Sequence, residues 1–320
     1  SEILANPPPR QPDAIELFNP TDNPVDLTDW WLSDTIQTPK KFRVPAGNTI
    51  PPQSFIVFDE TDFNPAPGDG ASFNLNAAGG TLVLSSGNAA GDLTGYAHIV
   101  TFGASAQGYT LGEVATPGQP SWRQLATPTL GAPNAGPLIG PIVISEIMYN
   151  GSVVAGADDF LEIYNASTQS VPLHDPSHPT NTWRILGVEF SFPQGVVLQP
   201  GQIAVLSQLL PDAFRSKYSI PAHVPVFQYA GTLGNNGEFL ALQRPNPPAA
   251  GQSLSFSDVD TLTYDDTAPW PTTPDGQGPS LERINWGTYA SLPEAWTASA
   301  APGGTPGRLP ALNYTQWRAI

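Results

Sequence analysis

The sequence contains no cysteine, which excludes disulfide bonds, thiolate metal sites and cysteine nucleophiles. It is also poor in positive charge, with 12 lysines and arginines against 28 aspartates and glutamates and a formal net charge of −16. Proteins that bind nucleic acid need clustered positive charge to displace phosphate counterions. The composition therefore argues against DNA or RNA as a partner. No run of eighteen apolar residues occurs, so we expect no membrane-spanning helix.

Proline and glycine are abundant, at 37 and 30 residues, while charged residues make up only 12%. Proline removes a backbone donor and glycine costs entropy inside a helix, so this mixture favours short strands joined by turns. The 40% of hydrophobic residues is too high for a disordered chain. We predict an all-β protein, and 320 residues suffice for two domains that each bury a core.

The chain repeats itself in order, spacing and residue class, which is the mark of a duplicated unit. The matching blocks are 1–3 and 145–147, 15–19 and 161–165, 42–57 and 190–205, and, at the ends, 131–133 and 304–306. Alternating apolar positions in these blocks predict strands that face a core. The core residues we predict are Ile15, Leu17, Trp30, Val57, Leu82, Ile163, Trp183, Val205 and Leu240.

Residues 128–141 are rich in proline and glycine, which predicts a short, stiff linker between the two copies. We therefore divide the chain into residues 1–137, residues 138–309, and residues 310–320 as a tail or the start of a further segment. The chain opens inside a strand pattern, so we expect the first strand to be truncated and the edge of the first copy to need completion. A short helix is expected around residues 210–218.

These blocks resemble the lamin-tail domain, and in particular its bacterial secreted branch. The residues that carry the resemblance are 145–150, 160–165, 26–34, 190–201, 275–283 and 303–307. The resemblance covers nearly all of residues 1–308 and implies two tandem immunoglobulin-like β-sandwich domains. It also implies a multidomain protein exported by bacteria and no common catalytic residue. We therefore expect an extracellular or cell-surface place, other proteins of such an assembly as partners, and no cofactor apart from the calcium considered below.

Candidate catalytic and metal-binding residues are few. Glu16 and Glu162 each lie in an apolar strand without an evident partner, so we expect them to face solvent or to bond backbone amides. His174 and His178 have a spacing that serves metal binding on a helix, but the adjacent prolines predict a loop. We predict that the protein is not an enzyme.

A group of aspartates around one strand is a weak candidate for calcium binding, because calcium prefers several oxygen ligands gathered on loops. These residues are Asp258, Asp260, Asp265 and Asp266. They match no known calcium-loop pattern, and solvated acidic loops are the competing interpretation.

Trp31 is the candidate for binding a partner. Alternation along 29–33 places Trp30 toward the core and Trp31 on the opposite face. An outward tryptophan can anchor a protein or a sugar, or it can be covered by a neighbouring loop or module.

The leading hypothesis is therefore a non-catalytic scaffold, spacer or assembly subunit that acts through sheet edges and exposed aromatics. The alternative is a carbohydrate-binding module of a larger secreted enzyme or adhesin, with polysaccharide as its partner.

Overall fold

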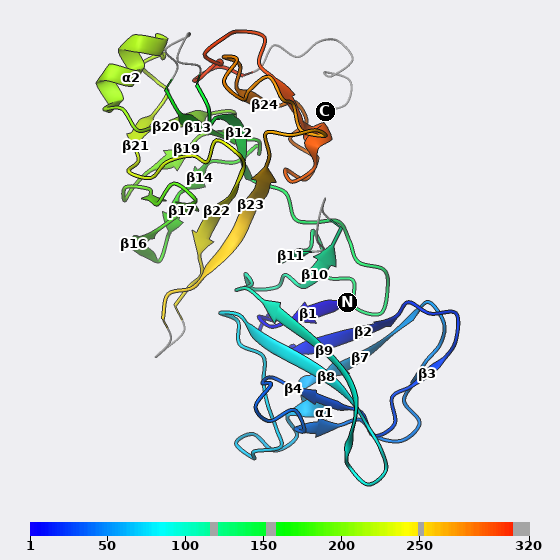
Figure 1. Ribbon diagram of the computed structural model, residues 1–320. Helices are drawn as coiled ribbons and strands as arrows, with labels where there is room; N and C mark the ends of the chain where they lie inside the picture. The colour runs from blue at the N-terminus through cyan, green and yellow to red at the C-terminus, as the bar shows by residue number, and fades with distance from the viewer. Residues whose placement is uncertain (116–120, 152–157, 249–252, 310–320) are drawn as a thin grey trace. The chain divides into compact units, whose positions relative to one another are not determined.

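The computed structural model describes residues 1–115, 121–151, 158–248 and 253–309, so the predicted tail 310–320 lies outside the described residues (Figure 1). The described residues are nearly all β, as the composition predicts. The chain divides into two compact units, and the change falls between Leu138 and Ile139. Among the described residues, no helix has the length and apolar character needed to cross a membrane.

Unit 1 contains a five-stranded and a four-stranded antiparallel sheet. The first has the order β11 (Ser121–Gln124), β10 (Leu111–Val114), β1 (Glu2–Leu4), β2 (Ala14–Asn19) and β7 (Ser54–Asp59). The second has the order β5 (Phe42–Arg43), β4 (Trp31–Ser33), β8 (Gly80–Gly87) and β9 (Leu93–Phe102). A small pair, β3 (Val25–Asp26) with β6 (Thr49–Ile50), and the short helix α1 (Glu60–Phe63) complete the unit.

Apolar side chains from both sheets of unit 1 meet in one core. Ile3 and Ile15 come from the first sheet, while Leu32 and Leu82 come from the second. The helix α1 adds Phe63, whose ring stacks on Phe73 with 4.8 Å between the ring centroids. The unit is therefore a β-sandwich with its core between the sheets, as predicted.

Unit 2 has a six-stranded sheet with the order β21 (Val226–Gln228), β20 (Ile203–Ser207), β13 (Phe160–Asn165), β12 (Ile142–Met148), β24 (Leu281–Arg283) and β25 (Trp296–Ala298). A four-stranded sheet has the order β18 (Phe190–Ser191), β17 (Arg184–Leu186), β22 (Glu238–Pro245) and β23 (Phe256–Tyr264). Smaller elements are β14 (Val171–Pro172) with β19 (Val197–Leu198), β15 (His174–Asp175) with β16 (His178–Thr182), α2 (Pro211–Tyr218) and the 3₁₀ turn η1 (Pro293–Ala295). The helix α2 confirms the one expected around 210–218.

The two units share a strand pattern that the repeat predicted. In unit 1, β2 pairs antiparallel with β1 and β7, and in unit 2, β13 pairs in the same way with β12 and β20. The turn after the central strand is also shared. The Asn19 side-chain amide donates to the carbonyls of Asn23 and Ile50, and Asn165 donates to those of Gln169 and Leu198.

The predicted core is largely correct. The side chains of Ile15, Leu82, Ile163, Trp183 and Leu240 are buried in the main cores, and Leu17 and Trp30 pack against the core while partly exposed. The prediction that Val57 belongs to the core is wrong, because 37% of this residue is exposed. Since side chains alternate along a strand, the buried Phe58 faces inward and Val57 faces outward. Val205 is buried as predicted, but in a second cluster that contains Phe214 of α2.

Candidate functional site

Three glutamates lie side by side across the first sheet of unit 2. Glu146 on β12 is opposite Glu162 on β13 and opposite Glu282 on β24. The β12–β13 register shifts between Ile144 and Glu146, which leaves Ser145 unpaired at that point. Its hydroxyl donates to Oε1 of Glu162 at 2.7 Å. All three glutamates are buried, so their charges require partners.

Those partners come from the segment that closes the unit. The backbone N–H of Thr305 donates to Glu146 at 2.7 Å, and that of Gly307 donates to Glu162 at 2.7 Å. The Thr305 hydroxyl also donates to Glu282 at 2.6 Å. We call residues 304–307 the closing segment of unit 2, since it seals the glutamates from solvent.

Gly304 shows how tightly the closing segment is packed. Its φ is +73°, a conformation that favours glycine, and a Cβ there would lie 2.4 Å from Oε1 of Glu146. Ser280 donates to that same carboxylate oxygen from the other side. The glutamates therefore act as hydrogen-bond acceptors inside a closed contact.

Burial makes the carboxyl groups of Glu146 and Glu162 weaker acids than usual. It raises the pKa of Glu146 to about 8, in opposition to the hydrogen bonds from Ser280 and Thr305 that lower it. Burial and the neighbouring Glu146 also raise the pKa of Glu162. A proton held within the cluster at neutral pH is the chemical consequence.

Unit 1 has the same arrangement with one carboxylate fewer. Glu2 accepts from the backbone N–H of Thr129 at 2.8 Å, and Glu16 accepts from that of Gly131 at 2.5 Å. The position opposite Glu2 on β10 is Gly112, where unit 2 has Glu282. Burial raises the pKa of Glu16 as well.

These contacts settle two expectations. Of the two alternatives for Glu16 and Glu162, bonding to backbone amides is confirmed and exposure to solvent is wrong. The contacts also correct the predicted match of residues 131–133 with 304–306. Gly131 donates to Glu16 as Gly307 donates to Glu162, so Gly131 corresponds to Gly307 and not to Gly304.

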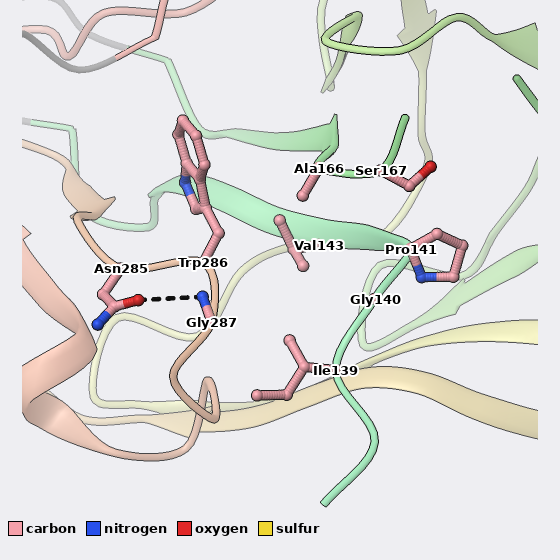
Figure 2. Close-up of a pocket in the computed structure, with 9 residues that line it drawn as sticks. All are labelled: Ile139, Gly140, Pro141, Val143, Ala166, Ser167, Asn285, Trp286 and Gly287. Atoms are coloured by element: carbon pink, nitrogen blue, oxygen red, sulfur yellow. Dashed lines mark hydrogen bonds between the residues drawn. The ribbon is translucent and has the colours of Figure 1, made fainter. Parts of the chain in front are cut away.

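Unit 2 also has an open hollow of about 350 Å³ (Figure 2). Its lining includes Val143, Ser167, Asn285 and Trp286, with the indole of Trp286 on one side. The Asn285 side chain accepts from the backbone N–H of Gly287 at 3.0 Å, which shapes the turn beside that indole. The hollow has no carboxylate in its lining, so it does not open onto the glutamate cluster.

Trp31 lies on β4 and is half-buried, facing away from the core residue Leu32. The Arg43 guanidinium lies over its ring, 5.6 Å from the ring centroid, and Arg43 is paired with Asp29 at 2.7 Å. A Cβ at Gly87 would lie 2.8 Å from Nε1 of Trp31. One ring face is thus covered by the chain itself, and the role of Trp31 as a partner anchor stays a prediction.

Residues 1–102 match the family model described as Lamin Tail Domain. The matched residues all lie within unit 1. No curated protein and no solved structure matches the chain. The lamin tail domain is an immunoglobulin-like fold and generally a non-catalytic interaction module. Glu2 and Glu16 lie within the matched residues, whereas Thr129 and Gly131, whose backbone N–H groups they accept from, lie beyond them.

The aspartates proposed for calcium lie outside the matched lamin tail domain. Asp260 is buried in an ion pair with Arg283 at 2.6 Å and accepts from the backbone N–H of Ile144. Asp258 accepts from Gln243, and Asp265 accepts from Thr267 in a turn. In the part of the chain that the structure describes, no three acidic or histidine side chains are grouped to hold a metal. His178 is paired with Asp175 at 2.8 Å.

Sequence reasoning missed Glu2, Glu146 and Glu282 as members of the cluster. The signal was present, since Ser-Glu-Ile occurs in both copies at positions 1–3 and 145–147. A carboxylate repeated inside an otherwise apolar strand indicates a buried acceptor, and its partners had to be sought at the far end of each unit.

Proposed function

We infer that this protein is a non-catalytic interaction module built from two like units and displayed outside a bacterial cell. The second unit is, in this proposal, a further copy of the lamin tail type. Its shared strand pairing and its equivalent glutamate contacts support that assignment.

The observation that carries the proposal is the contrast between the sealed glutamates and the exposed apolar sheet surface. The carboxylates are occupied by backbone donors and buried, so they are not available to a substrate. By contrast, the edge strand β9 exposes Leu93, Tyr96 and Ile99, with Ile99 55% exposed. Exposed strand edges and apolar side chains are the surfaces through which β-sandwiches bind other proteins.

The test asks where the protein is found in cells and whether another protein contacts Ile99. In cells that produce the protein, an antibody against it should detect the chain in the medium or on the surface, accessible to added protease. A photo-crosslinking amino acid at Ile99 should give a discrete cross-linked protein, whereas the same group at the exposed Asp22 should not. Detection only inside the cell, or identical cross-linking at both positions, would contradict the proposal.

The second candidate is carbohydrate binding, and the hollow beside Trp286 is the observation in its favour. Aromatic rings beside amide and hydroxyl groups suit sugars, and the hollow combines Trp286 with Asn285 and Ser167. Soluble polysaccharides should then retard the protein in affinity electrophoresis, and Trp286→Ala should restore its mobility. Recovery in Trp31→Ala instead would assign the sugar to Trp31 and not to the hollow. Equal mobility of the wild type with and without every polysaccharide tested would remove this candidate.

A further inference from the structure

Unit 1 has an apolar patch on the outer face of its first sheet, formed by the exposed Phe18 and Val57 and the half-buried Phe55. Phe18 on β2 is opposite Phe55 on β7, and their rings stack with 4.8 Å between centroids. Phe18 is 38% exposed and Val57 is 37% exposed. The two phenylalanines also line an open hollow of about 490 Å³. Adjacent exposed aromatic and aliphatic side chains of this kind mark a binding surface.

The same face of unit 2 is covered by the chain itself. The strand pairing places Tyr164, Ile203 and Val205 where unit 1 has Phe18, Phe55 and Val57. Ile203 and Val205 are buried against Phe214 of α2 and Val226 of β21. The strand β21 also extends the sheet, because it pairs in parallel with β20.

This cover is an insertion that unit 1 lacks. Leu75 corresponds to Leu233, because each is followed by a glycine four residues later and by a core leucine seven residues later. Leu233 lies 28 residues after Val205, whereas Leu75 lies only 18 residues after Val57. The short helix α1 follows β7 but sends Phe63 into the main core. Among the described residues, β7 pairs with β2 and with no strand on its other side.

We propose that the patch and the free edge of β7 bind an extended segment of another protein, which adds as a strand parallel to β7 in the way that β21 adds to β20. The segment would present apolar side chains at alternating positions, as Val224 and Val226 do in unit 2. This inference rests on the proposed interaction function and adds to it a second site, apart from β9, with its class of partner.

The backbone fixes where the segment binds. In unit 2 the N–H of Val205 donates to the carbonyl of Pro225 at 2.9 Å, so the equivalent N–H in unit 1 is that of Val57. The next outward amide, that of Asp59, is already bound to Oδ2 of Asp62 in the cap of α1. In unit 2, β21 pairs with residues 205–207, whose equivalents in unit 1 are residues 57–59. Because the amide of Asp59 is occupied, the added strand keeps the bonds at Val57 and continues toward Phe55.

The experiment uses the full chain and a synthetic peptide with the sequence of residues 222–230 as the probe. A labelled peptide should bind the wild type, as measured by fluorescence anisotropy. Val57→Lys should weaken binding by about ten-fold or more, because it places a charge in the apolar contact. Val197→Lys is the matched control, since Val197 is 39% exposed in unit 2, and it should bind as the wild type does.

A second probe tests the strand itself. A parallel ladder places the N–H of Phe227 of the peptide against the carbonyl of Val57, so N-methylation at that position should weaken binding to the wild type. Equal binding by Val57→Lys and Val197→Lys, or no binding by the wild type, would overturn the β7 site. Sedimentation in which the wild type dimerises and Val57→Lys does not would overturn the partner segment in favour of a second copy. Cross-linking from Ile99 in cells would be unaffected by these results, so failure here is distinct from failure of the proposed function.

Discussion

At the scale of single residues, each closing contact depends on a carboxylate that cannot reach water. Glu146 and Glu162 are tied to backbone N–H groups of residues 305 and 307, which lie near the opposite end of their unit in sequence. Buried hydrogen bonds to a charged or shared-proton acceptor are expensive to break, because the acceptor is left unsatisfied. These residues therefore join the start and the end of unit 2.

Gly304 is the residue at which this contact is most sensitive. Gly304→Ala should destabilise unit 2 by about 3 kcal/mol, since a positive φ costs about 1 kcal/mol and overpacking adds about 2. Gly195→Ala is the control, because Gly195 has φ +82° and no atom within 4 Å of the added Cβ. Urea unfolding followed by hydrogen exchange of peptides from unit 2 gives both values. An equal decrease in the free energy of unfolding in the two variants would show that the closing segment shifts to accept the added Cβ without loss of stability.

At the scale of elements, a buried ion pair joins the two sheets of unit 2 in addition to their apolar core. Arg283 on β24 donates to Asp260 on β23 at 2.6 Å, and to the carbonyls of Ile144 on β12 and of Thr288. Both side chains are almost fully buried, with exposed fractions of 0% and 2%. The pair thus bridges strands that do not hydrogen-bond to each other.

Removing one partner should be costly because it leaves a charge buried and unpaired. Arg283→Met should destabilise unit 2 by about 3–5 kcal/mol. The double variant Arg283→Met with Asp260→Leu should recover much of that loss, since no charge then remains in the interior. Thermal unfolding by calorimetry measures both variants, and a double variant no more stable than Arg283→Met would mean that the loss comes from packing and not from charge.

Elements also show what the sequence could and could not predict. The repeat predicted matching strands in the two copies, and the structure adds their pairing, since β1 pairs with β2 as β12 pairs with β13. Alternation alone does not say which phase faces inward, and Val57 was assigned to the wrong face for that reason. The repeated glutamates were visible in the sequence, but their donors could not be predicted, because residues such as 129 and 305 lie more than 100 residues from the carboxylates in the chain.

At the scale of the whole molecule, the acidic composition and the buried carboxyl groups act together. The formal net charge is −16, so repulsion grows as carboxyl groups ionise. In unit 1, burial raises the pKa of Asp13 from 3.8 to about 6, and in unit 2 it raises the pKa of Glu146 from 4.5 to about 8. The pH range over which such a group changes the stability is therefore narrower in unit 1 than in unit 2. The two units should therefore respond differently to pH.

The sign of the response follows from proton binding. Between pH 4.5 and about 8 the folded state keeps a proton on the Glu146–Glu162 pair that the unfolded state has lost. The stability from this group is therefore fully present below pH 4.5 and is lost as pH rises toward about 8. Unit 2 should unfold at a lower temperature at pH 8 than at pH 5, by calorimetry or by hydrogen exchange of its peptides. Glu146→Gln keeps an acceptor for Thr305 and cannot ionise, so its melting temperature should change less over the same range. A wild type and a Glu146→Gln variant with parallel pH profiles would assign the effect to overall charge repulsion and remove Glu146 as its source.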